Sequence, residues 1–308
     1  MTSRQLSAMA LAAGVWGASF LFIKVLLDAG MEPLGIAASR TALGGAALLP
    51  FVIFRRYWPD RRALLLLLLL GVGNMAIPWT LFGLAEERVE SGVASIANAS
   101  TPLWAALFAA ILIAGEGLGR RQLLGLGLGF AGVVVLTASD LSAIDSEAAA
   151  GIGYILIATG CYGVSTVAIR RWLRGVPALF LAAAQISVAA FALLPFALMT
   201  GALSGVSMGL GEWFSVIALG VAGSAIALIA YMWLIGEVGA VRASVVTYLI
   251  PPIGVFLGWA ILDEPLGWNL FAGLALVVLG VALVQGVPLA RAIRFARGRP
   301  QPVPSALD

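Results

Sequence analysis

The sequence predicts an all-α polytopic membrane protein whose ten transmembrane helices form two inverted five-helix repeats. Three observations lead to this fold class: an apolar composition, a succession of long apolar runs, and a likeness between the two halves of the chain. Of the 308 residues, 61% are hydrophobic and 11% are charged, whereas soluble domains carry about 25% charged residues. Because so few charges cannot cover a surface that faces water, lipid must be the solvent of this chain.

The apolar runs favour helices over strands. A helix needs roughly 20 apolar residues to cross a hydrocarbon core about 30 Å thick, whereas a β-barrel shows short segments of alternating polarity. Residues 64–70 are consecutive leucines, a run that no alternating strand would contain. We expect ten spans, near residues 6–27, 34–54, 63–85, 93–114, 123–138, 151–169, 178–200, 214–235, 243–262 and 270–287.

The basic residues predict the orientation. If the N-terminus is cytoplasmic, fifteen of the 18 Lys and Arg residues fall on the cytoplasmic side, and only Lys24, Arg40 and Arg88 lie in or near the outer halves. Short loops rich in Lys and Arg stay in the cytoplasm. We therefore expect a bacterial inner-membrane protein with both termini inside, residues 139–150 outside, and a disordered cytoplasmic tail at 289–308. The same distribution explains the pI near 9.4 without a nucleic-acid partner.

The two halves of the chain resemble each other, as a first repeat at residues 1–140 and a second at 150–288. Trp16-Gly17-Ala18-Ser19 aligns with Tyr162-Gly163-Val164-Ser165, and Ala47-Leu48-Leu49-Pro50-Phe51 recurs unchanged from Ala192 to Phe196. Further on, Leu70-Gly71-Val72 aligns with Leu219-Gly220-Val221, Ala94-Ser95 with Ala243-Ser244, and Pro102 with Pro251. Five helices is an odd number, so the repeats are inverted. Inverted repeats predict alternating access to a substrate site near the midplane.

Several of these motifs together resemble a known family. They are Trp16-Gly17-x-Ser19 with Lys24, Ser39-Arg40, and the stretch from Ala94-Ser95-Ile96 through Pro102 and Glu116 to Gly125 and Gly132, with a second copy from Ala243-Ser244 to Gly280. The chain resembles the drug/metabolite transporter superfamily, specifically its ten-helix exporters built from two EamA-type repeats, and is similar to the YddG-type amino-acid exporters. This resemblance implies efflux of a small metabolite across the inner membrane and leaves the solute open.

Two polar stripes suggest part of the substrate site. Ser95 and Asn98 share one helix face with Pro102, and Ser244 and Thr247 occupy the equivalent face before Pro251. A proline can leave a backbone carbonyl free for a ligand. The alternative is hydrogen bonding between helices, which contributes about 0.6 kcal/mol per pair in membranes. We favour this alternative for Ser95 and Ser244, and a binding role for Asn98, because an unpaired amide in hydrocarbon is costly.

Other candidates come from further spans and include aromatic residues too deep for an interfacial belt. An aromatic, mostly uncharged cavity would suit an amino acid with an apolar or aromatic side chain, although packing would explain the rings equally well. Arg40 is expected to be structural. The position of Lys24 near the outer end favours a pair with Asp28, or extension of its ammonium to the interface, over contact with a substrate carboxylate. The residues predicted to bind substrate are Trp16, Ser19, Asn74, Pro78, Ser95, Asn98, Tyr162, Ser165, Tyr231, Ser244, Thr247 and Tyr248.

The composition argues against an intramembrane enzyme. The chain has no histidine and one cysteine, Cys161, so serine-protease chemistry and the usual metal ligands are missing. Every aspartate falls in a predicted loop or tail, which removes an aspartyl-protease pair. The sequence shows neither a P-loop nor a dinucleotide fingerprint. We therefore expect no catalytic residue, no metal and no cofactor.

Rival transport modes remain. An exchanger of nucleotide sugars or phosphorylated metabolites should need several cations in its cavity, and only Lys24 and Arg40 are near. A channel or scramblase would tolerate the composition but would not explain inverted repeats. No acidic residue lies in the middle of a span, so proton coupling would have to use groups near the ends, such as Glu86 or Glu87, and facilitated exchange is equally open. A monomer in the lipid bilayer is expected, with a dimer as the alternative.

Overall fold

The computed structural model describes residues 1–54, 59–138, 145–204, 206–238, 243 and 245–286. This part of the chain is built from helices and contains no strand. Long runs of Leu, Ala and Val supply the helical segments, and polar side chains cap several of them. Asp60 accepts a hydrogen bond from the backbone N–H of Ala63 at 2.7 Å, and Asp145 accepts one from Glu147 at 2.9 Å, so each helix begins where its sequence provides an N-cap.

In the part of the chain that the structure describes, ten helical segments follow one another, as the sequence predicts. Six are long and apolar enough to cross a membrane: Ser3–Asp28, Arg61–Glu86, Ser91–Leu112, Ser146–Trp172, Ala178–Thr200 and Leu210–Val238. The first, fourth and fifth of these are the single helices α1, α8 and α9. The remaining four segments are α2 (Pro33–Phe54), α7 (Arg120–Val135), α13 (Val245–Leu262) and α14 (Trp268–Val284).

Three of the long segments are interrupted. The third segment of the chain consists of α3 (Arg61–Gly71), a π-helix η1 (Val72–Ala76) and α4 (Ile77–Glu86). The fourth consists of α5 (Ser91–Asn98) and α6 (Thr101–Leu112), with Pro102 at the start of α6. The eighth consists of α10 (Leu210–Ile217), a π-helix η2 (Ala218–Ile226) and α11 (Ala227–Val238). The two π-helices occupy equivalent places in the two halves, and π-helical turns are frequent at functional sites.

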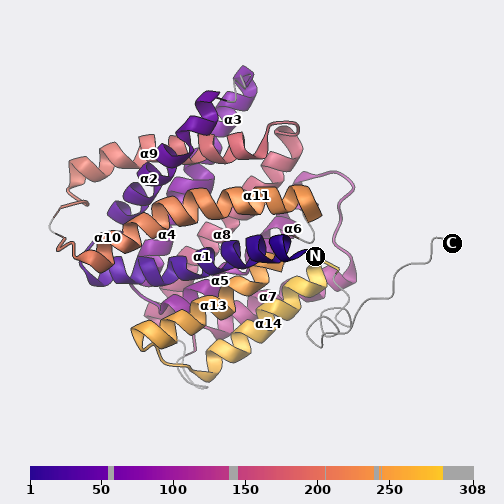
Figure 1. Cartoon of the computed structure of the whole chain (residues 1–308). Coiled ribbons are helices and arrows are strands. Elements are labelled where there is room, and N and C mark those ends of the chain that lie inside the picture. The colour runs from indigo at the N-terminus through magenta and orange to yellow at the C-terminus, as the bar shows by residue number, and fades with distance from the viewer. Residues whose placement is uncertain (55–58, 139–144, 205, 239–242, 244, 287–308) are drawn as a thin grey trace.

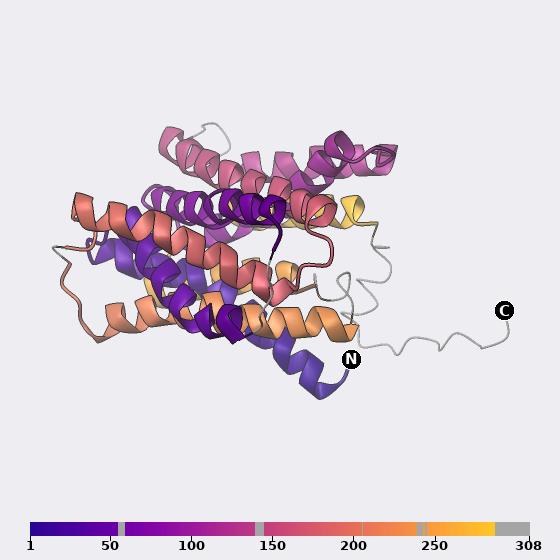
Figure 2. The same ribbon diagram turned by 90° about the horizontal axis from the view of Figure 1, so that it is seen from above.

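The packing follows the two-fold relation between the halves. Helix α2 packs on its counterpart α9, α7 on α14, and α5 on α13. Helices α4 and α6 pack on α8, just as α11 and α13 pack on α1. Figure 1 shows α9, α2 and α3 along one edge of the bundle and α13 and α14 along the opposite edge, and in the turned view of Figure 2 the helices again run in roughly one direction.

Glycines allow the closest of these contacts. A Cβ built on Gly280 of α14 would lie 2.5 Å from the Cα of Gly129 on α7, and one on Gly132 would lie 2.9 Å from the carbonyl oxygen of Gly273. Neither position therefore has room for a side chain. These small residues serve contact between the two halves within one chain, which holds the fifth helix of each repeat against the other.

Candidate functional site

A cavity of about 410 Å³ lies between the two halves of the chain. Its walls come from α1, α2, η1, α4, α5 and α6 of the first half and from α8, α9, η2, α11 and α13 of the second. Both π-helices contribute to it, η1 through Asn74 and Met75 and η2 through Gly223 and Ser224. The irregular backbone of the two interrupted segments thus borders the cavity, where irregular backbone in a membrane protein is tolerated.

Equivalent positions of the two repeats line the cavity. In the register that aligns the two halves, many of its lining residues form equivalent pairs, so each half presents the same positions to the same space. The pairs are Trp16 with Tyr162, Phe20 with Thr166, Asn74 with Gly223, Met75 with Ser224, Trp79 with Leu228, Phe82 with Tyr231, and Asn98 with Thr247. This position, at the junction of two inverted halves, is where a transporter of this architecture binds its substrate.

Arg40 on α2 lies in the cavity wall. Its side chain is 9% exposed, its Nε donates a hydrogen bond to Ser224 Oγ at 3.2 Å, and its guanidinium lies over the ring of Trp79 at 4.0 Å. Among the described lining residues it is the only basic one. From the sequence, Arg40 was expected to have a structural role. Its place as a single buried cation inside an apolar helix was the signal that could have marked it as a site candidate.

A second polar contact crosses the same space. Asn74 on η1 donates through Nδ2 to Oε1 of Gln185 on α9 at 2.8 Å, and the Nε2 of Gln185 donates to Leu181 O at 3.0 Å. Gln185 was not among the residues predicted from the sequence to bind substrate. In the register of the repeated Ala-Leu-Leu-Pro-Phe motif, Gln185 occupies the position equivalent to Arg40, and that correspondence could have revealed it.

Aromatic rings cover much of the remaining wall. Trp16 donates through Nε1 to the carbonyl oxygen of Gly223 at 2.9 Å and meets the ring of Tyr231 edge-on, with 5.1 Å between the ring centroids. Phe82 stacks on Tyr162, with centroids 6.2 Å apart, and meets Phe20 edge-on. Such edge-on and stacked rings hold one another in fixed orientations, so the cavity has a preformed apolar wall.

Four predicted site residues do not line this cavity. Pro78 is buried at the start of α4, and Ser165 is buried in α8. Ser95 Oγ donates to Gly92 O at 2.8 Å and lies 3.4 Å from Pro251 O on α13, so it serves the contact between helices that was weighed as its alternative role. Tyr248 turns its hydroxyl away, to Gln285 Oε1 at 2.7 Å.

The remaining predictions fall as follows. Ser244 lies outside the described residues. The cavity brings together the other seven residues predicted to bind substrate, which are Trp16, Ser19, Asn74, Asn98, Tyr162, Tyr231 and Thr247.

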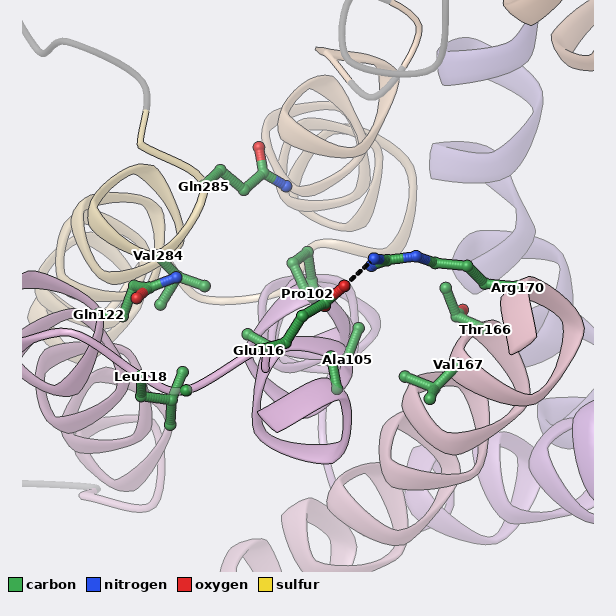
Figure 3. Close-up of a pocket in the computed structure, with 13 residues that line it drawn as sticks. Pro102, Ala105, Glu116, Leu118, Gln122, Thr166, Val167, Arg170, Val284 and Gln285 are labelled. Carbon is green, nitrogen blue, oxygen red and sulfur yellow. Dashed lines mark hydrogen bonds and ion pairs between the residues drawn. The ribbon is translucent and has the colours of Figure 1, made fainter. Parts of the chain in front are cut away.

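A second cavity, of about 420 Å³, adjoins the first. Pro102 and Thr166 line both, so these two residues lie between the two cavities. In Figure 3 the Glu116 side chain reaches across the second cavity to Arg170 of α8, and the two form an ion pair between the halves. This cavity lies where α6 and α8 end and α7 begins. We call this side of the bundle the Arg170 end.

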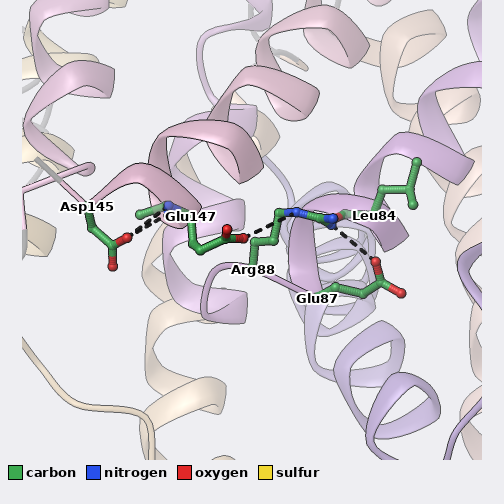
Figure 4. A network of polar contacts seen from close by, with 6 residues as sticks. Leu84, Glu87, Arg88, Asp145 and Glu147 are labelled. Atoms are coloured by element: carbon green, nitrogen blue, oxygen red, sulfur yellow. Dashed lines mark hydrogen bonds and ion pairs between the residues drawn. The ribbon is translucent and has the colours of Figure 1, made fainter.

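The opposite side of the bundle, where α1 and α4 end and α5 and α8 begin, is here called the Asp28 end. It is closely packed, since Ile23 and Phe82, which line the first cavity on this side, are buried, and so is Leu26 further along α1. Figure 4 shows Arg88 bridging two helices there: its Nη1 donates to Leu84 O at 2.7 Å and to Glu87 at 3.2 Å, while its Nε lies 3.6 Å from Glu147 of α8.

A carboxylate from the second half also closes the Asp28 end. Glu264, between α13 and α14, accepts hydrogen bonds from the backbone N–H groups of Ser91 at 2.7 Å and Gly92 at 3.0 Å. These are free N–H groups of the first turn of α5, which a carboxylate satisfies well. The first cavity therefore has the second cavity as its neighbour on the side of the Arg170 end and packed side chains on the side of the Asp28 end.

Comparisons with known proteins agree with this architecture. The model of the EamA-like transporter family matches twice, at residues 4–138 and 149–285. The inner membrane transporter YedA of Escherichia coli K12 is 28% identical over 275 residues, covering 88% of this chain and 87% of YedA. A transporter of Archaeoglobus fulgidus is 25% identical over 278 residues, covering 90% of this chain and 96% of its own.

Two further comparisons concern the solute of a relative and the fold. A probable terminal-alkyne amino-acid exporter of Streptantibioticus cattleyicolor is 25% identical over 293 residues, covering 94% of this chain and 96% of the exporter. A solved crystal structure with 21% sequence identity superposes with a TM-score of 0.63 and covers 95% of this chain and 99% of its own. At that identity the superposition supports the fold alone.

Proposed function

This chain belongs to the EamA-like transporter family, and on that premise we propose that it exports a small metabolite carrying a carboxylate. The preferred substrate is an amino acid with an apolar or aromatic side chain. It moves by alternating access: the two halves rearrange about the cavity between them, which opens first to one side of the membrane and then to the other.

The observation that carries this proposal is the position of Arg40 in the aromatic cavity. Of the three guanidinium nitrogens of Arg40, only Nε donates a hydrogen bond to a described residue. The two terminal nitrogens are therefore available to a ligand. A guanidinium binds a carboxylate through two parallel hydrogen bonds. Ser224 and Trp79 hold the guanidinium in place before the ligand arrives, which lowers the entropy lost on binding.

The rest of the cavity supports a modest apolar solute. Its volume of about 410 Å³ lies within the range of about 300–1,000 Å³ that is usual for small-molecule sites. Rings of Trp16, Phe82, Tyr162 and Tyr231 offer an apolar surface. Asn98 and Thr247, at equivalent positions of the two halves, are the groups we assign to the polar part of the solute.

The shape of the transport path supports export. The second cavity shares Pro102 and Thr166 with the first and lies at the Arg170 end, and we infer that the two form one path to that side. The basic clusters of the sequence gather at the same end, including Arg61, Arg120 and Arg170. Loops rich in arginine stay in the cytoplasm. The state described here is then open to the cytoplasm and closed to the outside, and it would take up its solute from the cell. A relative named as a probable amino-acid exporter supports both the direction and the solute class.

A phosphate-bearing solute is the second candidate, and the cavity disfavours it. A phosphate group needs several cationic partners to replace its hydration. Arg40 is the single basic residue among those described in the cavity wall, and Lys24 lies beyond the wall, where its ammonium donates to the backbone carbonyl of Glu86 at 2.9 Å. This contact also replaces the expected pairing of Lys24 with Asp28.

Counterflow in proteoliposomes tests the proposal. Vesicles loaded with unlabelled phenylalanine should accumulate labelled phenylalanine transiently and saturably, and vesicles without the protein should not. Phenethylamine has the same ring and amine but no carboxylate, so it should exchange poorly. Equal exchange of both compounds would contradict a carboxylate site at Arg40. Linear flux without counterflow would contradict alternating access and favour a channel.

A further inference from the structure

The last residue of α4, Glu86, carries a buried carboxyl group without a partner. Its side chain is 0% exposed, and neither Oε1 nor Oε2 has a hydrogen-bond donor among the described residues. A carboxylate in such surroundings loses its hydration and gains nothing in return, which costs several kcal/mol. Polar groups in this position inside a membrane protein are rare, and they mark ion or proton pathways.

The charged groups around Glu86 are all engaged elsewhere. On α1, Lys24 donates to the backbone carbonyl of Glu86, not to its carboxyl group, and Asp28 adds a negative charge. On α2, Arg40 bonds to Ser224. Beyond α13, a second carboxylate, Glu264, faces the same region while it caps α5.

Two charged neighbours on the same stretch of chain give no counter-charge either. The exposed Glu87 pairs with Arg88, and Arg88 reaches on to Glu147 of α8. The Glu86 carboxyl group therefore has no ion pair in the described structure. Glu264 and Asp28 repel its charged form from neighbouring elements, Lys24 and Arg40 attract it, and the loss of hydration on burial acts against it most strongly. A neutral carboxylic acid fits these surroundings, whereas a carboxylate does not.

The position of Glu86 ties its charge to the transport path. Glu86 lies one helical turn beyond Phe82, whose ring borders the cavity and meets Phe20. Lys24 lies one turn beyond Phe20 on α1. Glu86 thus belongs to the layer that closes the cavity at the Asp28 end. When that end opens, water reaches the carboxyl group and its ionised form is no longer penalised.

We propose that Glu86 is the proton-binding site that couples this transporter to a pH gradient. The inference rests on the proposed function, alternating-access transport. After the solute has left through the open Asp28 end, the Glu86 carboxylate takes one proton from the external water and becomes a neutral acid, which allows the end to close. The proton later leaves to the water of the cavity, one helical turn away, and the carboxylate is restored. One proton thus moves inward for each solute that moves outward.

A proton fits the site better than a metal ion. Ions such as Na⁺ and Ca²⁺ need several oxygen ligands, as the 6–8 oxygens around Ca²⁺ illustrate. Among the described residues no group of three or more His, Cys, Asp and Glu side chains could hold a metal ion. The nearest cation, the Lys24 ammonium, already occupies the backbone oxygen of Glu86.

Infrared spectroscopy tests proton binding without any substrate. The wild-type protein in lipid should show the C=O stretching band of a protonated carboxylic acid, shifted in heavy water. This band should disappear in Glu86→Gln and persist in Glu87→Gln, a matched control at the next, exposed position. A wild-type spectrum without a band that depends on Glu86 would overturn the proposal. Glu86→Leu serves as the second variant if Glu86→Gln does not fold.

Transport assays test the coupling separately from the substrate site. In vesicles with an acidic lumen and a clamped membrane potential, wild type and Glu87→Gln should accumulate a zwitterionic solute about tenfold per unit of pH difference, because one proton exchanges for one solute. Glu86→Gln should not respond to the gradient. Counterflow at equal pH reports the solute site alone.

The outcomes separate the two proposals. If wild type shows counterflow but no gradient-driven accumulation, proton coupling is overturned and the proposed function stands. If Glu86→Gln responds to the gradient as wild type does, the assignment to Glu86 is overturned. If wild type exchanges no carboxylate solute at all, the proposed function fails, and with it the coupling, whatever the infrared band shows.

Discussion

Asn74 on the π-helix η1 and Gln185 on α9 join the two halves of the chain through one hydrogen bond of 2.8 Å between their side-chain amides. Arg40 on α2 and Ser224 on the π-helix η2 form the counterpart contact at 3.2 Å. In both cases a polar side chain on the second helix of one half holds the π-helix of the other half. The two interrupted helices are therefore fixed to the opposite repeat at the edge of the cavity.

A double-mutant cycle should detect the first of these contacts. The variants Asn74→Ala and Gln185→Ala remove the two amides singly and together, and the coupling free energy should be about 0.6 kcal/mol and at most about 1.7 kcal/mol, as for other hydrogen bonds between membrane helices. Reversible unfolding in detergent gives this number. Asn269, which donates to Leu136 O on α7, provides the control, and Asn269→Ala should be additive with Gln185→Ala. Additivity of Asn74→Ala with Gln185→Ala would refute the contact.

Replacing Arg40 should weaken solute binding. Arg40→Gln removes the charge while keeping a polar side chain, and the Kd for phenylalanine should rise at least about thirtyfold, because truncating one member of a buried charge pair costs about 2 kcal/mol or more. Arg40→Lys should fall in between, since it keeps the charge but loses the paired donors and the contact with Trp79.

The control for Arg40 is Arg4, which also lies over an aromatic ring, that of Trp233, but at the exposed start of α1. Arg4→Gln should bind phenylalanine as wild type does. Scintillation-proximity binding in detergent measures all four proteins. An unchanged Kd in Arg40→Gln would show that Arg40 does not bind the carboxylate of phenylalanine. The main support for the proposed solute class would then be lost.

The polar pair Asn98 and Thr247 in the cavity wall should affect transport more than stability. Asn98→Ala and Thr247→Ala each remove a group that lines the cavity, so each should lower the transport efficiency by up to about tenfold, as expected for a lost hydrogen bond of about 0.5–1.5 kcal/mol. Ser95→Ala, on the same helix as Asn98, should lower thermal stability more than transport. The reason is that Ser95 bonds to carbonyls of α5 and α13. Thermal melting and counterflow on the same preparations separate these effects. If Asn98→Ala melts early and transports normally, Asn98 only holds helices together.

The ion pair at the Arg170 end should contribute little to stability. Glu116 and Arg170 are 36% and 51% exposed, and pairs in water-exposed positions contribute about 0–1 kcal/mol. Because the pair crosses the mouth of the second cavity (Figure 3), Glu116→Gln and Arg170→Gln should instead raise the rate of solute exchange, and the rates should converge with wild type at high salt. The exchanged pair Glu116→Arg with Arg170→Glu should restore the wild-type rate. A large loss of thermal stability in the single variants would show that the pair supports the fold.

The orientation can be read with reporter fusions. A reporter joined near Asp145, which caps α8 at the Asp28 end, should behave as external, and one joined after residue 287 should behave as cytoplasmic. The reason is the clustering of arginines at the opposite side of the membrane. Alkaline phosphatase and green fluorescent protein report the two sides in the same cells. An external C-terminus would reverse the direction of transport that we propose.

The fold class could be predicted from the sequence because it depends on local properties. An apolar run such as residues 64–70 has no stable environment except lipid, and in lipid its backbone must form a helix. The arrangement of two five-helix halves followed from motifs that recur in the same order. The interruptions were not predicted, because the π-helices at Val72–Ala76 and Ala218–Ile226 carry no proline, and their backbone depends on contacts with α2 and α9.

The candidate site was only partly visible in the sequence. Periodicity places Ser95 and Asn98 on one helix face, but it cannot tell which residue faces a cavity and which faces a helix. That difference comes from Gly254 on α13, which lets α13 approach Ser95 so closely that a Cβ there would lie 2.5 Å away. Arg40 and Gln185 were missed for the same reason: their partners lie on helices that are distant in the chain.

The sequence by itself thus determined that this chain lies in a membrane, that it is helical and that it consists of two related halves, since each of these properties follows from the polarity and order of neighbouring residues. Only the tertiary structure decided which polar groups share a cavity and which are buried without a partner. Glu86 shows the difference. The sequence placed it near the end of a span, and the packing of α4 against α8, α2, α1 and α5 left its carboxyl group enclosed and without a hydrogen-bond donor among the described residues.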